Sequence, residues 1–224
     1  MSRLARIVIP GLPHHITQRG NNRQDVFFVD EDKQQYLRIL HEQSAEYDFS
    51  VLGYCLMTNH VHIIGAPGRE ESLARAVGRT NYLYTLYVNR MHGRSGHLWQ
   101  NRFYSCGLDD HHFWLALRYV EQNPVRAKMV RVPWRYEFSS AAVHVGETNK
   151  NEIIDIKAWE KLSHGLNWKE ILKQNLESEV SENFRNNYRR GRPLGSDNFI
   201  SKLETLLNRR LRPLPVGRPK KSKK

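Results

Sequence analysis

The sequence predicts an α+β fold: a central antiparallel sheet of split βαβ design, followed by a small, mostly helical C-terminal module and a basic tail. Three observations predict it. Segments typical of strands and helices alternate in the order β-α-β-β-α-β-α over residues 14–122. After Leu108 the predicted helices no longer alternate with strands, and most of the net charge of +12 lies near the C-terminus.

The seven predicted elements are, in chain order, a strand at 14–20, a helix at 30–48, strands at 49–59 and 60–67, a helix at 71–93, a strand at 101–108 and a helix at 109–122. The first strand ends in a glycine turn. Asp30 can cap the first helix, in which apolar side chains recur at helical spacing. The polar pair Thr58-Asn59 is short enough for a hairpin loop between two strands.

The ends of the later helices also carry signals. Gly93 suits the C-terminus of the second helix, because glycine readily adopts the left-handed conformation that ends helices. Asp109 can cap the last helix. This order of elements is that of a ferredoxin-like split βαβ arrangement with an added helix.

The composition divides the chain into three parts, at 1–145, 146–190 and 191–224. The first is the α+β domain. The second is polar and charge-mixed, and is predicted to form helices or a loosely ordered linker. The third contains a short predicted helix at 195–210, capped by Ser196, and a Pro- and Lys-rich tail that is predicted to be disordered until it binds a partner.

The charge distribution indicates a polyanionic partner. Residues 189–224 carry twelve Lys/Arg against Asp197 and Glu204, so this segment holds +10 of the net charge of +12. Nucleic acid is favoured over a membrane surface, because the tail has no strongly amphipathic helix with aromatic residues; a merely solubilising tail is the alternative. Without a signal peptide, a long apolar run or a disulfide pattern in its two cysteines, the chain is expected to be cytoplasmic.

The stretch "LMTNHVHIIGAP" places two histidines in an otherwise apolar strand. Alternate residues of a strand point to the same face, so His60 and His62 share one face and Val61 and Ile63 the other. The Val/Ile face can pack on helices, and the two imidazoles can converge on one cation. The alternative is that the pair decorates a polar face, because no third histidine or cysteine lies nearby and a local zinc site is disfavoured.

The helix at 109–122 can complete such a site. Tyr119 lies off its apolar stripe, and Asn123, one turn later, projects from the same flank. The Asn123 amide oxygen is a possible third ligand, with Gln122 as its nearest substitute. Two imidazoles and one amide oxygen leave positions for phosphate oxygens, which suits Mg²⁺ or Mn²⁺. Tyr119 would be the nucleophile, or alternatively an aromatic that packs the helix on the sheet.

Four blocks in sequence resemble the single-tyrosine HUH transposases, named for a histidine-hydrophobe-histidine signature. They are "GLPHHITQRGNNRQ", "TNHVH", "GHLWQNRFYS" with "LRYVEQNPVRAKMV", and "WRYEFSSA". The order is correct and the resemblance covers about residues 1–145. The chain is most similar to the REP-associated tyrosine transposases, relatives of the insertion-sequence-200-like elements, and this resemblance implies the HUH fold.

The resemblance also implies a function: metal-dependent cleavage and rejoining of single-stranded DNA, on hairpins formed by palindromic repeats. Tyr119 matches the position of the nucleophile, which would form a 5′-phosphotyrosine. His60 and His62 match the metal ligands, and Asn123 stands where other members carry Gln. The expected DNA contacts are Arg19, Trp99, Gln100 and Arg102 beside the site, and Arg218, Lys220 and Lys221 in the tail.

Three other functions stay open at this stage. One is a DNA-binding protein that keeps the HUH fold without its chemistry. Another is an HUH replication initiator or relaxase, and a third is an RNA phosphodiesterase that uses two histidines and forms no covalent intermediate. The sequence leaves the oligomeric state open between a monomer and a homodimer.

Overall fold

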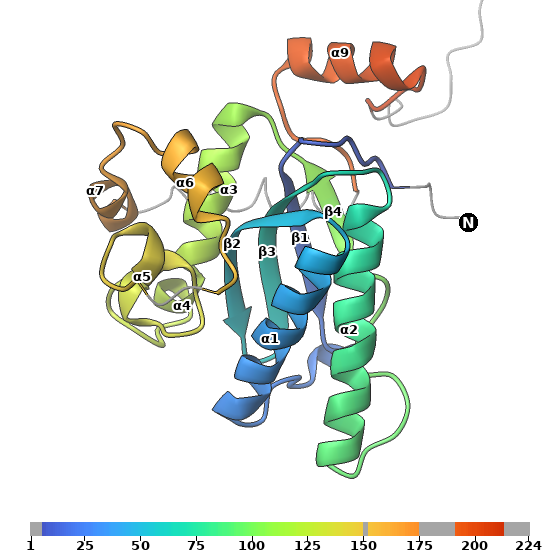
Figure 1. Ribbon diagram of the computed structural model, residues 1–224, viewed down its shortest axis with the longest axis vertical. Helices are drawn as coiled ribbons and strands as arrows, with labels where there is room; N and C mark the ends of the chain where they lie inside the picture. The colour runs from blue at the N-terminus through green and yellow to red at the C-terminus, as the bar shows by residue number, and fades with distance from the viewer. Residues whose placement is uncertain (1–5, 150–151, 175–190, 213–224) are drawn as a thin grey trace, which may run out of the picture.

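The computed structural model describes residues 6–149, 152–174 and 191–212, which form one sheet with helices on both faces (Figure 1). The four strands are β1 (His14–Arg19), β2 (Phe49–Met57), β3 (His60–Pro67) and β4 (Tyr104–Gly107). They lie in the order β2-β3-β1-β4, and every neighbouring pair is antiparallel. The predicted α+β class and the split βαβ arrangement are therefore confirmed.

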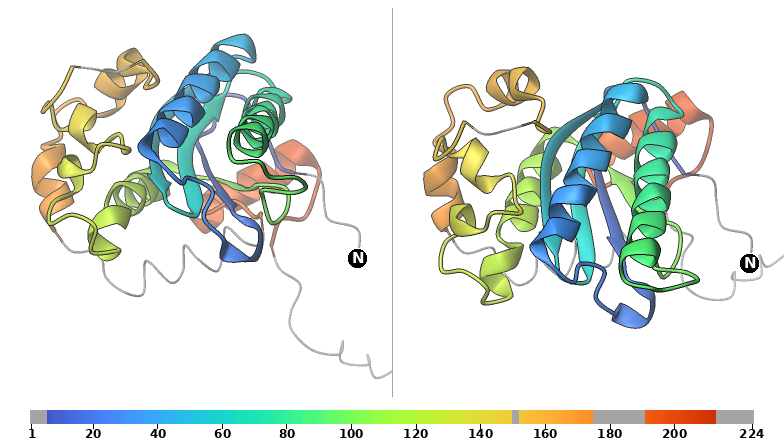
Figure 2. Two further views of the ribbon diagram at one scale, coloured as in Figure 1. Left: turned by 90° about the horizontal axis from the view of Figure 1, so that it is seen from below. Right: turned by 60° about the horizontal axis from the view of Figure 1, so that its bottom comes forward.

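Helices α1 (Asp30–Glu46) and α2 (Ser72–Met91) cover one face of the sheet, while α3 (Asp110–Glu121) lies on the other (Figure 2). Ile16, Val61 and Ile63 are fully buried, and Ile16 pairs with Ile63 across β1 and β3. The prediction that the Val/Ile face of β3 packs on helices is confirmed. None of the helices in the described residues is long and apolar enough to cross a membrane.

Most of the predicted helix ends are correct. Asp109 and Ser196 accept hydrogen bonds from the backbone amides three residues later, as caps do. Gly93 follows α2 with φ of 58°. The assignment of Asp30 as a cap is wrong: α1 starts at Asp30, and the buried Asp32 carboxylate accepts hydrogen bonds from the amides of the two residues preceding the helix.

The fourth strand is shorter than predicted. The residues before Tyr104 leave the sheet, although the Gln100 amide still donates to the Arg19 carbonyl. Gln18 contributes to this departure, because its Nε2 donates to the Asn101 carbonyl at 2.6 Å. The outer edge of β1 is thus bordered by an irregular segment, residues 97–103, instead of a full strand.

Several short helices follow α3 and pack on its outer flank: α4 (Asn123–Arg126), η2 (Pro133–Arg135), α5 (Ala141–His144), α6 (Ile156–Leu162) and α7 (Trp168–Lys173). Trp114 of α3 lies against Trp159 and Trp168, with ring centroids 6.0 and 5.4 Å away. Residues 152–174 therefore take the helical alternative predicted for 146–190, and they share the hydrophobic core of the sheet.

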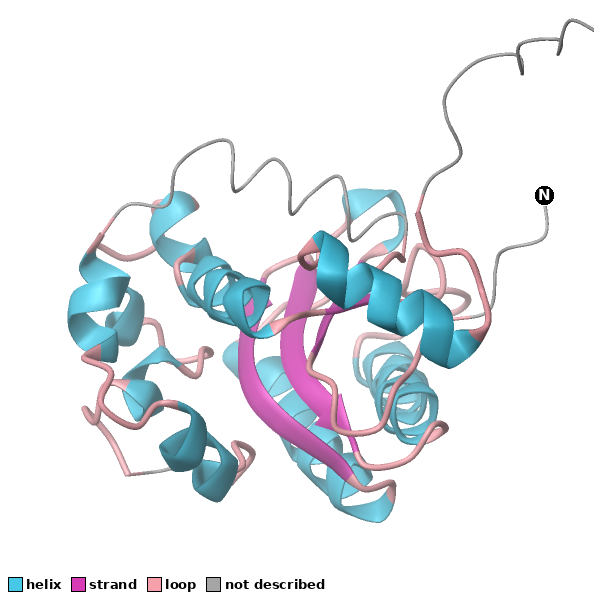
Figure 3. Cartoon of the chain, turned by 90° about the horizontal axis from the view of Figure 1, so that it is seen from above, coloured by secondary structure: helices cyan, strands magenta, loops and turns pink. Residues whose placement is uncertain are grey.

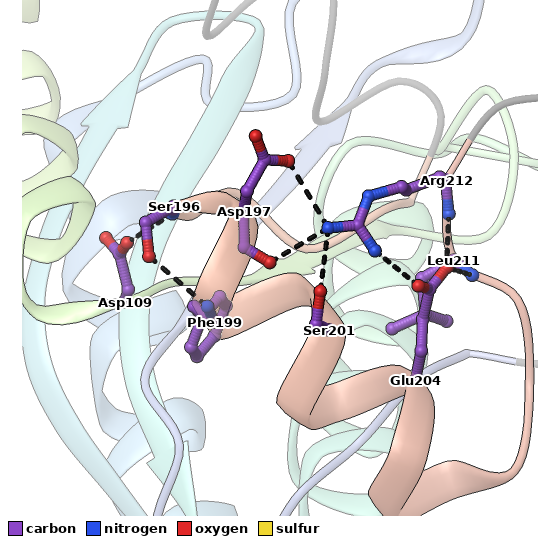
Figure 4. A network of polar contacts seen from close by, with 8 residues as sticks. All are labelled: Asp109, Ser196, Asp197, Phe199, Ser201, Glu204, Leu211 and Arg212. Carbon is purple, nitrogen blue, oxygen red and sulfur yellow. Dashed lines mark hydrogen bonds and ion pairs between the residues drawn. The ribbon is translucent and has the colours of Figure 1, made fainter.

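Helix α9 (Asp197–Leu207) lies on the same side of the sheet as α3 (Figure 3). Its entry segment is fixed to β4, because Leu194 donates to the Gly107 carbonyl and forms a parallel bridge with Leu108. Arg212 then folds back over the helix and contacts Asp197, Ser201 and Glu204 (Figure 4). The tail residues Arg218, Lys220 and Lys221 lie outside the described residues.

Candidate functional site

A polar cavity of about 680 Å³ lies between the α3 face of the sheet and the C-terminal end of α3. On this face Thr17 is opposite His62, and Arg19 is opposite His60. The cavity is thus lined by side chains from all four strands, from α3 and from α4. Its lining consists of Thr17, Arg19, Arg23, Met57, His60, His62, Gln100, Tyr104, Tyr119, Asn123, Arg126 and Ala127.

His60 is held by its hairpin loop. Its Nδ1 lies 2.7 Å from Oδ1 of Asn59, and Nδ2 of the same amide donates to the Arg23 carbonyl. Because Oδ1 can only accept, Nδ1 of His60 carries the proton and donates. In the neutral ring this leaves the lone pair of Nε2 available to a cation.

His62 is held by another histidine, His15 of β1. Nδ1 of His62 and Nε2 of His15 are 2.9 Å apart, and the two rings stack with their centroids 5.1 Å apart. His15 is completely buried beneath the cavity and does not line it. Since this hydrogen bond uses Nδ1 of His62, Nε2 is again the nitrogen left for a ligand.

Burial keeps these imidazoles neutral. Burial and the nearby Arg19 charge lower the pKa of His60 to about 4, and burial lowers the pKa of His15 to about 3. The pKa of His62 lies well below its ordinary value because of burial and the neighbouring His60, His15, Arg126 and Arg19. At neutral pH the pair is therefore in the form that binds metals.

Tyr119 lies beside the histidine pair. Its ring centroid is 5.8 Å from that of His62 and 6.2 Å from that of His15, both in edge-on arrangements. The side chain is buried, at 4% exposed, yet it lines the cavity. Arg126 covers the ring at 4.1 Å and donates to the Tyr119 carbonyl, which fixes the end of α3.

Asn123 and Gln122 point to opposite sides of the helix end. Asn123 lines the cavity, and its Nδ2 donates to the Tyr119 carbonyl at 3.2 Å, which leaves Oδ1 as the free acceptor. Gln122 donates instead to the carbonyls of Leu172 and Gln174. Of the two amides considered from the sequence, only Asn123 reaches the cavity. Pro124 lies in the first turn of α4 and does not disrupt this placement.

The residues present fit a divalent cation. Two neutral imidazoles present Nε2, and an amide oxygen is available beside them, which is a donor set that Mg²⁺ or Mn²⁺ accepts. The described residues contain no group of three His, Cys, Asp or Glu that could hold a metal. A cation at His60 and His62 would therefore need further oxygen ligands from Asn123, water or a phosphate.

The predicted DNA contacts divide between two cavities. Arg19 lines the polar cavity and makes no ion pair within the described residues, and Gln100 borders it as well. Trp99 and Arg102 line a second cleft beside α2. The Trp99 indole donates to the Asn81 carbonyl and packs near Tyr84, with ring centroids 6.0 Å apart, so this side chain is held against the core.

Sequence reasoning missed several residues of the site. Arg126 follows Tyr119 by two helical turns, so its spacing could have indicated a shared face. His15 becomes a partner of His62 only through the register of β1 on β3, which a single strand pattern does not contain. Asn59 belongs to the predicted hairpin loop, and its position next to His60 allows its side chain to orient the imidazole.

Comparisons with known proteins identify a family. Residues 9–123 match the model of the IS200-like transposase family. One similar structure is a REP-associated tyrosine transposase solved with a REP hairpin; it has 19% identity and a TM-score of 0.55 over 68% of this chain and 90% of that chain. A putative transposase from Deinococcus radiodurans also has 19% identity, over 54% of this chain and 97% of that chain, with a TM-score of 0.35. No curated protein matches the chain.

The fold and the family match together define a transposase. The family match spans just over half of the chain and includes the histidine pair, Tyr119 and Asn123. The chain belongs to the IS200-like transposase family.

Proposed function

We propose that this transposase cleaves and rejoins single-stranded DNA through a covalent bond to Tyr119, with a divalent cation at His60 and His62. One observation carries the proposal. The phenol, the two neutral imidazoles and the Asn123 amide border one polar cavity, and all of them come from the same chain. A single molecule therefore supplies every group that the reaction needs from the protein.

The residues of the polar cavity have distinct roles in the proposed reaction. His60 and His62 would hold Mg²⁺ or Mn²⁺ through Nε2, with Asn123 as an oxygen donor. When bound, such an ion polarises the phosphate and stabilises the charge that develops on its oxygens. Arg19 and Arg126 add fixed positive charge to the cavity walls, which favours the binding of a DNA phosphate.

The chemical step conserves the number of phosphodiester bonds. The Tyr119 hydroxyl loses its proton to solvent as its oxygen attacks the phosphorus, the bond to the 3′ oxygen breaks, and the leaving strand takes up a proton from solvent as a free 3′-OH. The phosphate remains on Tyr119 as a 5′-phosphotyrosine. Attack by a 3′-OH of another strand reverses these changes, so strand transfer requires no ATP.

Hairpin DNA is the proposed substrate. The similar structure named above was solved with a REP hairpin, and the cavity of this chain is open and positively charged. A basic C-terminal segment with ten net positive charges suits the phosphates of a paired stem. A hairpin with an unpaired flank would place a single strand in the cavity and offer its paired stem to the basic segment.

The proposal is tested by incubating the full chain, in the presence of Mn²⁺, with hairpins that carry single-stranded flanks and a label at the 3′ end, the end that a 5′-phosphotyrosine retains. On a denaturing gel, part of the label is expected to migrate with the protein and to be absent when EDTA is present. A protein that binds the hairpins tightly but never retains label would be the catalytically idle alternative. Cleavage without any protein-bound label would favour a hydrolytic mechanism instead.

A further inference from the structure

A second cleft, of about 620 Å³, lies on the opposite side of β1, between α2 and the irregular segment 97–103. It is separate from the polar cavity, but Gln100 lines both. The short β4 creates this space, because beyond Tyr104 no regular strand covers the outer edge of β1. A strand of DNA that leaves the polar cavity past Gln100 would reach the cleft next.

The floor of the cleft presents one unused acceptor and one unused donor. Gln18 is 3% exposed; its Nε2 donates to the Asn101 carbonyl, and its Oε1 has no partner within the described residues. Asn81 is 7% exposed; its Oδ1 accepts from the Tyr36 hydroxyl, and its Nδ2 likewise has no partner there. Neither atom is sealed from solvent, so both are available to a ligand that enters the cleft.

The wall on α2 is shaped for a flat group. Tyr82, a residue that is 52% exposed, lines the cleft, and the Arg79 guanidinium lies 5.2 Å from its ring centroid. One turn before it, Gly78 also lines the cleft, and nothing lies within 4 Å of the position that a Cβ would occupy. Glycine weakens a helix relative to alanine, and neither its backbone conformation nor its packing calls for it here. Its absent side chain leaves the wall open.

The rim carries positive charge. The exposed Arg102 lines the cleft and makes no hydrogen bond or ion pair within the described residues. Arg6 lies over the Phe103 ring at 3.7 Å and donates to the Phe103 carbonyl. The cleft thus combines an exposed aromatic ring, two arginines, one hydrogen-bond donor and one acceptor. Groups of these kinds bind an unpaired nucleotide.

We propose that this cleft binds one unpaired base of the DNA strand, stacked on Tyr82, with its edge read by Gln18 and Asn81 and its phosphate held by Arg102. The proposal deepens the proposed function, on which it rests, by naming where the single-stranded flank is recognised. A base whose edge offers one donor and one acceptor side by side fits the two amides. The cleft therefore contributes sequence preference away from the cut phosphate.

The test uses full-length protein with Tyr119→Phe, so that cleavage cannot disturb binding. Fluorescein-labelled single strands of one base type each are titrated and followed by anisotropy. Gly78→Leu, which fills the cleft, and Tyr82→Ala are each expected to weaken the best-bound strand by about tenfold and to level the differences among bases. Leu86→Ala is the matched control, because Leu86 is similarly exposed on α2, at 50%, and does not line the cleft.

A scan with abasic sites sharpens the result. Removal of one particular base from a mixed strand should weaken binding to the Tyr119→Phe protein, and should have no further effect once Gly78→Leu is added. If the Gly78→Leu and Tyr82→Ala proteins keep the same affinity and the same preference among bases as the Leu86→Ala control, the proposal is overturned. This outcome is distinct from a failure of the proposed function, which shows as the absence of protein-bound label in the wild-type cleavage assay.

Discussion

The two flanks of helix α3 use buried polar side chains in opposite ways. On one flank, Tyr119 and Asn123 face the polar cavity. On the other, the fully buried Glu121 carboxylate accepts from Ser140 at 2.5 Å, from the Trp168 indole at 2.8 Å, and pairs with His144 at 2.5 Å. The hydrogen-bonding capacity of the Glu121 carboxylate is used by protein groups. In contrast, Asn123 Oδ1 and the Nε2 atoms of the histidine pair are directed to the cavity.

The difference separates two kinds of buried histidine in one molecule. Nδ1 of His144 is hydrogen-bonded to the Glu121 carboxylate, and the ring stacks on Trp159 with centroids 3.8 Å apart. These contacts stabilise the packing of α3 on the helices that follow it. His60 and His62 are each oriented through Nδ1 and keep Nε2 on the cavity side. Neither burial nor an unpartnered Nε2, which His144 also has, identifies the site; the polar cavity that His60 and His62 share with Tyr119 and Asn123 does.

The largest effect is expected from Tyr119→Phe. Removal of the hydroxyl should lower cleavage by at least about a thousandfold, the scale typical of a lost nucleophile. Binding of hairpin DNA should change little, because the ring and its contact with Arg126 remain. Single-turnover cleavage and gel-shift measurements on the same preparation check both parts, and cleavage that survives would assign the nucleophile to another residue.

Removal of the cation ligands comes next. The double substitution His60→Ala and His62→Ala, or treatment of the wild type with EDTA, is expected to reduce cleavage to background while the protein remains folded. Titration with Mn²⁺, followed by electron paramagnetic resonance, should show one bound ion in the wild type and none in the double variant. His41→Ala is the control, since His41 is exposed on α1 and does not line the polar cavity; loss of Mn²⁺ binding there would contradict the assignment.

Glu121→Ala is expected to destabilise the fold on the flank of α3 that faces away from the polar cavity. It leaves Ser140, His144 and Trp168 without their common acceptor, and loss of one member of a buried ionic cluster costs about 3–5 kcal/mol. Urea unfolding measures this loss. The fraction that remains folded should still bind Mn²⁺, because the carboxylate does not line the cavity; a selective loss of metal binding in fully stable protein would mean that the two flanks are not separate.

The smallest effect is expected for Asn59→Ala. Nδ1 of His60 would lose its acceptor, so the ring would lose its fixed orientation but keep its ligand nitrogen. Loss of such a partner typically lowers metal affinity by about 10- to 100-fold. Isothermal titration with Mn²⁺ measures the change, and an unchanged affinity would show that the hairpin loop does not orient His60.

The sequence predicted the parts of the site that depend on local periodicity. Strand alternation placed His60 and His62 on one face, and helical spacing placed Tyr119 and Asn123 on one flank; the structure shows both arrangements. The order of strands and helices also predicted the fold. These features depend on neighbours within a few residues, which a single chain pattern contains.

The rest depends on contacts between distant segments. His15 meets His62 through strand register, and the partners of Glu121 lie 19 to 47 residues away from it. The cleft on α2 arises because segment 97–103 leaves the sheet earlier than its sequence pattern suggests. Local periodicity does not contain these contacts between distant segments. The sequence pattern therefore does not predict that Asp32, His15 and Glu121 are buried and hydrogen-bonded.

The central claim, that Tyr119 is the residue joined to DNA, has a direct measurement. Wild-type protein is incubated with hairpin DNA and Mn²⁺, the DNA is trimmed with nucleases, and the protein is digested with trypsin for mass spectrometry. The peptide between Arg118 and Arg126, YVEQNPVR, contains a single tyrosine. A nucleotide mass on this peptide, absent in EDTA, is the predicted result; a nucleotide mass on another peptide, with this one unmodified, would contradict the account.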